Sequence, residues 1–515
     1  MTCVNNSANY ACIGRSRAPY SGEISSILVD EVMESLGALD QLFYKADQYG
    51  VGSLIMGGTS ILAPTKTGET LDARAIADHL RARLGRIPLL RKKLVQDPLR
   101  IGCVYKVDDP DFDVRSHIDV QSLAAPGGYV ELARAIGELS STPLELSKLW
   151  HWTVLDGLEG GKLAVVCQIH HALADGIGIS EVLSSMYDPQ PVQPESPTTD
   201  APVAETEPGR ISLLGNAVME SGRRLYIDTP RFVIKSARPV LAALGEKLSS
   251  QIQGRGWQDA DEAPYFVQDT SLNTAHRSTR RKIAWRTLDL PEIKQTARSL
   301  GCSVNDIGLY LYSCALEHYL AAIGEAADFD LWCGMPVNTR SSDPDQQGGN
   351  QVSNGKVCLN NTLADPIARL QAISASARSA RETALDAYPV VSMEELGDVI
   401  PPATVDSMLY LSRRFNLLGR VGKTYPVMHS VLSNVPGPPT TVYIANGALV
   451  ESIPVIPAMD VIAVSGGFVS VGKAITVGFN CDGDAVDDPD LLAAGVDIGM
   501  ANLRRCVKAA KKAKG

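Results

Sequence analysis

Two adjacent histidines, His170 and His171, are followed in this chain by Asp175 and Gly176, a spacing that suits acid–base catalysis. A neutral imidazole can take a proton from a hydroxyl near pH 7 and return it to a leaving group. A single histidine at a strand end more often serves local packing, but all four residues at this spacing would arise by chance about once in a thousand. We therefore predict a general-base site in this segment.

An apolar run over residues 163–171 leads into this segment and predicts a short strand that is buried on both faces. Neighbouring strand residues point to opposite faces, so only one histidine can face a given cavity, and we assign that role to His171. Asp175 is placed to hold the turn that follows. Gly176 lets a ligand approach the backbone where a Cβ would block it.

Helical and strand-like patterns alternate along the whole chain, which indicates an α/β fold. Apolar residues at helical spacing and short apolar runs of strand length occur on both sides of the chain's midpoint. The helical stretches are residues 71–84, 129–139 and 304–322, and the other strand-like runs are 330–337, 461–471 and 474–479.

A segment dense in Pro, Thr and Glu, residues 188–209, divides the chain into two comparable halves. It has almost nothing to bury, so we expect a mobile linker, followed by helices over 211–249 that cross between the halves. The predicted boundaries are a disordered N-terminal extension 1–32, an N-terminal lobe 33–187, a linker with crossover helices 188–270 and a C-terminal lobe 271–515.

Charge and composition exclude some classes of function. A net charge of −10 and 6% aromatic residues argue against nucleic-acid binding. The ten cysteines form no C-x-x-C pair and no metal-like spacing to histidine, so we expect reduced thiols and no metal. No secretory signal or spanning apolar window is evident, which predicts a cytoplasmic location. The basic C-terminus, Arg504–Lys514, could rest on anionic lipid headgroups or be a solvated helix end.

The segment His170–Gly176 resembles the H-H-x-x-x-D-G signature of the CoA-dependent acyltransferase superfamily. Further matches resemble one group within it, the bacterial wax ester synthase/diacylglycerol acyltransferases, over about residues 34–500. These matches are Leu39–Phe43, Asp109–Asp113 with His117, Asn305–Asp306, Pro336–Arg340 with Gly349-Asn350, and Ser433–Pro438. The chain departs from the family where its P-L-W is split between Pro143-Leu144 and Leu149-Trp150.

The resemblance implies two chloramphenicol-acetyltransferase-like lobes, with mixed sheets flanked by helices and a tunnel between them. It implies an O-acyltransferase that moves a long-chain acyl group from acyl-CoA to diacylglycerol or a long-chain fatty alcohol, without an acyl-enzyme. His171 would be the general base. No cofactor is expected, because acyl-CoA is a substrate.

The resemblance also implies roles for residues of the second half. Asn305, Asp306 and Asn434 would bind substrate, and the two asparagines are candidate donors to the oxyanion, although each could equally be a turn residue. Asp175 would form a salt bridge with Arg340. Such lipid substrates also suggest peripheral contact with the inner membrane face or with lipid droplets.

Other chemistries fit the residues less well. Cys167 lies four strand residues, about 13 Å, from His171, too far for a Cys–His pair. Ser465 has no G-x-S-x-G context, and the acidic residues at 482–488 favour a turn over a calcium loop. Two alternatives stay open, namely a non-catalytic acyl-lipid binding protein and a condensation-type acyltransferase that uses a carrier-protein thioester.

Overall fold

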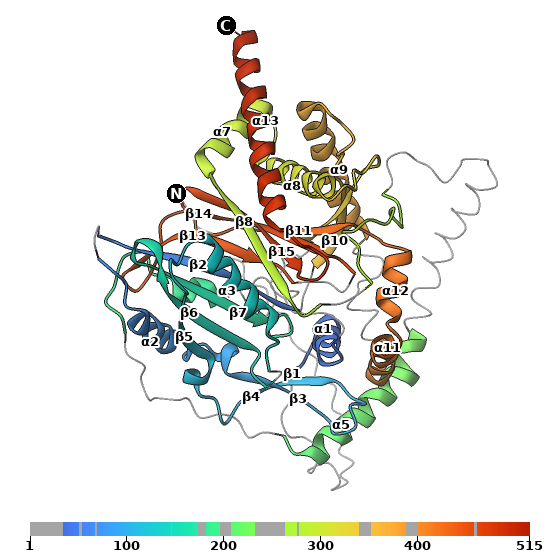
Figure 1. Ribbon diagram of the computed structural model, residues 1–515. Helices are drawn as coiled ribbons and strands as arrows, with labels where there is room; N and C mark the ends of the chain where they lie inside the picture. Colours follow the sequence, from blue (N-terminus) through green and yellow to red (C-terminus); the bar gives the residue numbers. More distant parts are fainter. Residues whose placement is uncertain are drawn as a thin grey trace, which may run out of the picture.

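The computed structural model describes residues 34–50, 54–66, 69–145, 147–173, 182–195, 208–231, 263–275, 278–338, 352–387, 399–457 and 461–514. These residues form two lobes, each built on a mixed six-stranded sheet flanked by helices (Figure 1). A small three-stranded sheet lies at the edge of the N-terminal lobe and consists of β1 (Glu34–Ser35), β4 (Val104–Asp108) and β3 (Lys92–Gln96). The α/β fold class predicted from the sequence is confirmed.

The sheet of the N-terminal lobe has the strand order β12-β13-β2-β7-β6-β5, so β7 lies at its centre. Alternate residues of β7 enter different cores, because Val165 and Cys167 pack with helix α2 whereas Ala164 and Val166 pack with α3. This two-sided burial explains the unbroken apolar run. The elements are β2 (Ile55–Pro64), β5 (Ile118–Ser122), β6 (Trp150–Leu158), β7 (Lys162–His170), β12 (Tyr443–Ile444), β13 (Gly447–Val455), α2 (Ala73–Leu84) and α3 (Tyr129–Ser141).

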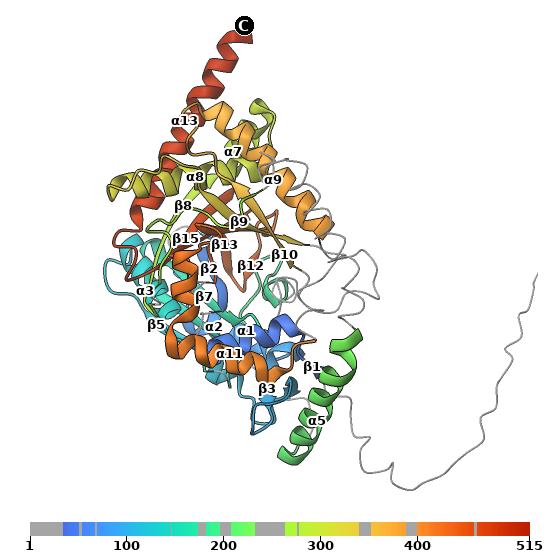
Figure 2. The ribbon, with the colours of Figure 1, turned by 90° about the vertical axis from the view of Figure 1, so that its right-hand side faces the viewer.

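The sheet of the C-terminal lobe has the order β10-β9-β11-β14-β15-β8. Helix α8 is buried on nearly every side between this sheet and the helices α7, α9 and α13, and α13 projects beyond the lobe in both views (Figures 1 and 2). The elements are β8 (Arg281–Asp289), β9 (Trp332–Asn338), β10 (Val352–Cys358), β11 (Ser430–Val435), β14 (Val464–Val471), β15 (Ala474–Asp482), α7 (Leu290–Leu300), α8 (Val304–Ala322), α9 (Pro366–Ala387) and α13 (Asp490–Lys514).

The two lobes are joined by a strand pairing and by a helix–strand contact. Strands β12 and β13 follow the C-terminal lobe's β11 in sequence, yet β13 pairs antiparallel with β2 of the N-terminal lobe. In return, α3 packs on β8. Between the lobes lies a small pocket with Gln168 of β7 on one side and Arg281 and Asn480 on the other. The tunnel expected between the lobes stays a prediction.

Further helices surround the junction of the lobes. Helix α1 (Ala38–Gln48) lies beside α11 (Pro402–Phe415), which is followed by α12 (Leu417–Thr424) (Figure 1). Helix α5 (Arg210–Arg223) continues into the π-helical turn η4 (Arg224–Asp228), and Figure 2 shows α5 at the side of the molecule. Short 3₁₀ turns complete the N-terminal lobe at η1 (Pro88–Arg91), η2 (Val114–His117) and η3 (Glu159–Gly161).

The first part of the predicted linker contacts the N-terminal lobe, since Asp188 pairs with Tyr443 and accepts a hydrogen bond from Arg83 at 2.8 Å. The mobility of the linker stays a prediction. Glu195 also forms ion pairs with Arg83 and Arg86. Ion pairs and backbone hydrogen bonds, and not apolar burial, therefore attach residues 188–195 to the N-terminal lobe. Residues 196–207 and 1–33 lie outside the described residues.

Candidate active site

The two histidines lie at the C-terminal end of β7, where backbone hydrogen bonds to both neighbouring segments hold them. The N–H of His170 donates to the carbonyl of Leu149 at 2.7 Å, and the N–H of His171 donates to the carbonyl of Leu54 at 2.9 Å. Leu149 belongs to the split motif that precedes β6. The two imidazoles therefore start from a rigid strand end, which positions side chains more precisely than a loop does.

The His170 ring is buried and faces the protein interior. It is 0% exposed, and its Nδ1 accepts a hydrogen bond from the backbone N–H of Ala172 at 3.0 Å. An accepting Nδ1 places the proton of a neutral ring on Nε2. That Nε2 lies 3.4 Å from a carboxylate oxygen of Asp47, an ion-pair distance at an angle that does not meet hydrogen-bond geometry. His170 thus fixes the turn after β7.

The His171 ring is only partly exposed, and it packs edge-on against Phe43, with the ring centroids 4.5 Å apart. Burial lowers the pKa of the His171 imidazole to about 4; a hydrogen bond with its own backbone opposes this shift and the nearby His170 adds to it. The ring is consequently neutral at pH 7. A neutral imidazole can accept a proton, which is the state that a general base requires.

Helix α1 supplies contacts to both histidines, through Phe43 to His171 and through Asp47 to His170. In the sequence, Leu39–Phe43 is recognisable only as a motif match, and nothing singles out Asp47. The four-residue spacing of Phe43 and Asp47 puts both on one face of the helix. The spacing predicts that Phe43 and Asp47 share a face of the helix, but it does not predict that this face contacts the end of β7.

Two of the predicted substrate-binding residues contact each other across the C-terminal lobe. Asn305 lies in the first turn of α8 and Asn434 lies near the end of β11, and the Nδ2 of Asn434 donates to the Oδ1 of Asn305 at 3.3 Å. Asn434 is exposed and Asn305 is partly exposed. The Nδ2 group of Asn305 carries two N–H donors. Substrate binding by this pair stays a prediction.

Asp306 has a clear local role in the capping of α8. Its carboxylate accepts a hydrogen bond from the N–H of Ser303 at 2.8 Å, while the Ser303 hydroxyl accepts one from the N–H of Asp306. Ser374 donates a third hydrogen bond to the same carboxylate, at 3.1 Å. This capping box satisfies the end of the helix and fixes the turn that carries Asn305. A direct contact of Asp306 with substrate stays a prediction.

Three other predicted site residues, Asp175, Gly176 and Arg340, lie outside the described residues. The Asp175–Arg340 salt bridge therefore stays a prediction.

Two further motif matches, His117 and Ser433–Pro438, contact strands of the two sheets. The His117 ring stacks on Trp150 with centroids 4.4 Å apart, and its Nδ1 lies 2.9 Å from the Trp150 carbonyl at the start of β6. In Ser433–Pro438, a Cβ on Gly437 would lie 2.0 Å from the carbonyl oxygen of Ser470, so only glycine fits. These residues shape the strand ends.

The rival nucleophiles are poorly placed. Burial raises the pKa of the Cys167 thiol to about 12, which disfavours the reactive thiolate. Ser465 is buried within β14. The carboxylate of Asp482 accepts hydrogen bonds from the N–H groups of Asp484 and Ala485, as the predicted turn requires. Among the described residues, no cluster of three or more His, Cys, Asp or Glu side chains could hold a metal ion.

Comparison with a solved structure defines the class of fold. The chain resembles the wax ester synthase/diacylglycerol acyltransferase from Marinobacter aquaeolei VT8 with a TM-score of 0.63 and 20% identity, over 92% of this chain and 100% of that chain. Both chains therefore have the same two-lobed fold.

Sequence comparison then identifies the family. Residues 36–308 match the model of the wax ester synthase/diacylglycerol acyltransferase catalytic domain, and residues 348–504 match that of the WS/DGAT C-terminal domain. The chain belongs to this family and is an acyltransferase.

Two relatives from Mycobacterium tuberculosis H37Rv are similar over most of their length. "Putative diacyglycerol O-acyltransferase Rv0221" is 28% identical over 84% of this chain and 87% of its own. "Putative diacyglycerol O-acyltransferase Rv3087" is 26% identical over 74% of this chain and 78% of its own. Within the described residues, no helix is long and apolar enough to span a bilayer.

Proposed function

We propose that this enzyme transfers a long-chain acyl group from acyl-CoA to diacylglycerol or a long-chain fatty alcohol, which yields triacylglycerol or wax ester and free CoA. The observation that carries the proposal is His171, a neutral and partly exposed imidazole on a rigid strand end within the family's catalytic domain. The names of the mycobacterial relatives favour diacylglycerol as an acceptor.

In the proposed reaction, His171 accepts the proton of the acceptor hydroxyl as the oxygen attacks the thioester carbonyl. A tetrahedral oxyanion forms, the C–S bond breaks, and the protonated imidazole returns the proton to the departing CoA sulfur. No acyl-enzyme and no cofactor are needed. Holding both substrates in one site supplies much of the rate, because the attack becomes effectively intramolecular.

A low pKa makes His171 a weak base, so electrostatic help for the oxyanion is important. We assign this help to the amide groups of Asn305 and Asn434, which offer N–H donors next to each other. The Asn434→Ala variant should then lose about 10- to 100-fold in kcat, with a smaller change in KM. Asn502→Ala, on helix α13, is the matched control. Equal activity of both variants would remove the pair from the mechanism.

The test of the function uses the purified full chain with palmitoyl-CoA and either hexadecanol, dioleoylglycerol or no acceptor. Released thiol and the ester product are measured together. Ester formation that is lost in His171→Ala, but retained in His318→Ala on α8, would support the proposal. Thiol release without an ester, or activity only with a carrier-protein thioester, would contradict it. Acyl-CoA binding without turnover would point to a lipid-binding protein.

We also propose peripheral contact with a membrane or lipid droplet, because both the acceptor and the product are lipids.

A further inference from the structure

Helix α11 exposes most of its large apolar side chains and buries several small or polar ones. A surface helix normally buries its apolar stripe. Here the buried positions, spaced three or four residues apart, are Pro402, Asp406, Leu409 and Ser412. The large apolar side chains instead face outward, namely Met408 at 63%, Tyr410 at 57%, Leu411 at 45% and Phe415 at 53% exposure.

Helix α12 continues this arrangement because its glycines face the protein. A Cβ on Gly419 would lie 2.4 Å from the Ala275 carbonyl oxygen, and one on Gly422 would lie 2.3 Å from a Val461 methyl. The helix backbone thus packs directly on the C-terminal lobe. Its bulky residues face outward, and Leu417, Leu418 and Val421 are 44%, 48% and 57% exposed.

Polar anchors hold both helices without help from the outward side chains. Lys45 of α1, which is 1% exposed, forms an ion pair with Asp406 and donates to the carbonyl of Pro402 at 3.3 Å. In α12, Lys423 donates to the carbonyls of Thr270 and Asn273 at 3.0 and 2.9 Å. These contacts involve none of the outward apolar residues, whose exposure is typical of an interaction surface.

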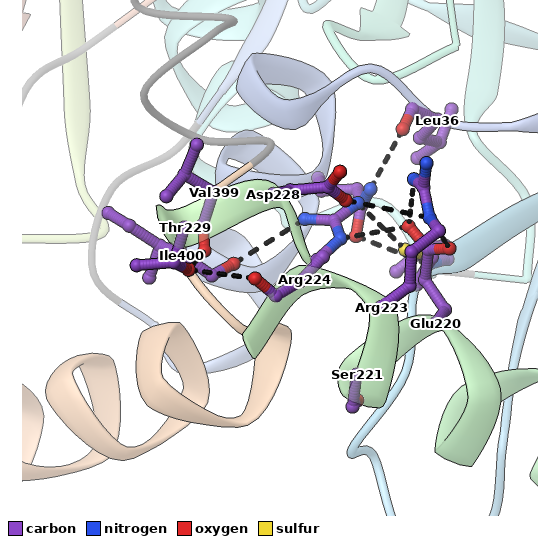
Figure 3. A network of polar contacts seen from close by, with 12 residues as sticks. Leu36, Glu220, Ser221, Arg223, Arg224, Asp228, Thr229, Val399 and Ile400 are labelled. Carbon is purple, nitrogen blue, oxygen red and sulfur yellow. Dashed lines mark hydrogen bonds and ion pairs between the residues drawn. The ribbon is translucent and has the colours of Figure 1, made fainter. Parts of the chain in front are cut away.

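A second contact network ties the start of α11 to η4 (Figure 3). Arg224 donates to the carbonyl of Ile400 at 3.4 Å, and the Thr229 hydroxyl donates to the carbonyl of Val399 at 3.2 Å. Next to these contacts, η4 exposes Leu225, Tyr226 and Ile227. The exposed apolar residues of η4 thus lie near those of α11.

The charge of this region is opposite to that of the whole chain. Residues 402–427 contain four basic side chains, Arg413, Arg414, Arg420 and Lys423, against the single acid Asp406, a net charge of +3 in a chain of net charge −10. The three arginines are exposed among the apolar residues, and Arg414 lies over the Phe415 ring at 5.6 Å. Exposed apolar side chains interleaved with arginines are typical of helices that lie in the interface of anionic bilayers.

We propose that α11 and α12 form a docking surface for an anionic phospholipid membrane. The apolar residues enter the headgroup boundary while Arg413, Arg414 and Arg420 pair with lipid phosphates. This inference builds on the peripheral contact proposed above and specifies its surface. Because α11 contacts α1, and α1 contacts both histidines, the docked membrane would lie one helix away from the site.

The end of α13 is the competing basic surface, and it lacks the apolar component. Its cations Lys508 and Lys512 extend from the lobe, and Arg504 is already paired with Glu292 at 2.6 Å. Within the described part of α13, Ile498 is the one large hydrophobic side chain that is prominently exposed, at 45%. The basic end of α13 can attract an anionic membrane by its charge, but it has few exposed apolar side chains to insert into the bilayer.

The test is co-sedimentation of the full chain with phosphatidylcholine vesicles, either alone or with phosphatidylglycerol. Binding should require the anionic lipid and should fall about tenfold or more in Arg413→Gln/Arg414→Gln and in Leu418→Gln/Val421→Gln. The matched variants Lys508→Gln/Lys512→Gln and Ile498→Gln should bind as the parent chain does. His171→Ala should also bind normally, which separates docking from catalysis.

Three outcomes would overturn the proposal. They are the absence of vesicle binding, binding that only the α13 lysine variant loses, and a self-association in analytical ultracentrifugation that the α11–α12 variants abolish without any effect on vesicle binding. The last would identify the surface as an interface between copies of this chain.

Discussion

The two sides of the strand end at β7 differ in surroundings, although their histidines are adjacent in sequence. On one side, His170 is sealed in the interior, where the Ala172 N–H and the Asp47 carboxylate surround its ring. On the other side, His171 is partly exposed and packs edge-on against Phe43. The first environment favours a fixed support and the second allows proton transfer. This difference agrees with the alternation of side chains along a strand, which places adjacent residues on opposite faces.

The sharpest way to break this comparison is His171→Ala. Loss of a general base should lower kcat/KM for ester formation by about 10²- to 10⁴-fold. The free energy of unfolding should change little, since the ring is partly exposed and the backbone hydrogen bond from His171 to Leu54 is kept. Steady-state assays and urea denaturation of the same preparation would check both. Unchanged turnover would exclude His171 as the base.

The opposite behaviour is expected of His170→Ala. This change leaves the buried N–H of Ala172 without its acceptor and opens a cavity, so the free energy of unfolding should fall by about 2–3 kcal/mol. His170→Asn, which can restore an acceptor, should recover part of that loss. Chemical denaturation is the measurement. A variant as stable as the parent but as inactive as His171→Ala would reverse the two assignments.

The pH dependence of kcat/KM sharpens the assignment of His171. With its pKa lowered to about 4 by burial, this ring is neutral above that value, so activity should stay level from pH 7 down to about pH 5 and fall below it. The unfolded state binds the proton already near pH 6.5, so stability should also decline between pH 6.5 and 4. Assays at low pH therefore require a parallel check that the chain is folded. An acid limb near pH 6.5 in folded enzyme would show that the ring is not held as described.

The smallest effect is expected at Asp47. Asp47→Asn keeps the shape of the side chain but removes the negative charge 3.4 Å from the Nε2 of His170. We expect a loss of about 1 kcal/mol in stability and a less than tenfold change in kcat, because Asp47 touches the supporting histidine and not the base. Thermal and urea unfolding would measure the first, and steady-state kinetics the second. A loss of activity as large as that of His171→Ala would mean that the two sides of the strand end act as one unit.

Much of the fold could be predicted from local patterns. The apolar run at 163–171 predicted β7, and the helical spacings predicted α2, α3 and α8. Both patterns depend only on residues that are close in sequence, namely an unbroken apolar run for a strand buried on both faces and a 3.6-residue period for a helix. The docking of Asp188 on Arg83 could not be predicted in this way, because it depends on ion pairs between distant segments. Nor could the outward apolar face of α11, whose residues look like core in sequence.

The candidate site shows the same limit. The histidines were found from their spacing, since motif residues are contiguous. The contacts of Phe43 and Asp47 with them, and of Asn305 with Asn434, join positions more than a hundred residues apart. Such pairings are fixed by the tertiary fold and have no local signal.

The placement of β13 means that the two family domains should not survive as separate fragments. A chain that ended after the first half would leave one edge of β2 without the partner strand that covers it, and an open strand edge invites pairing with other molecules. Co-expressed halves, by contrast, could restore that ladder together. Activity that is regained when two individually insoluble fragments are mixed would show that the N-terminal lobe needs β13, from the last third of the chain, in order to fold.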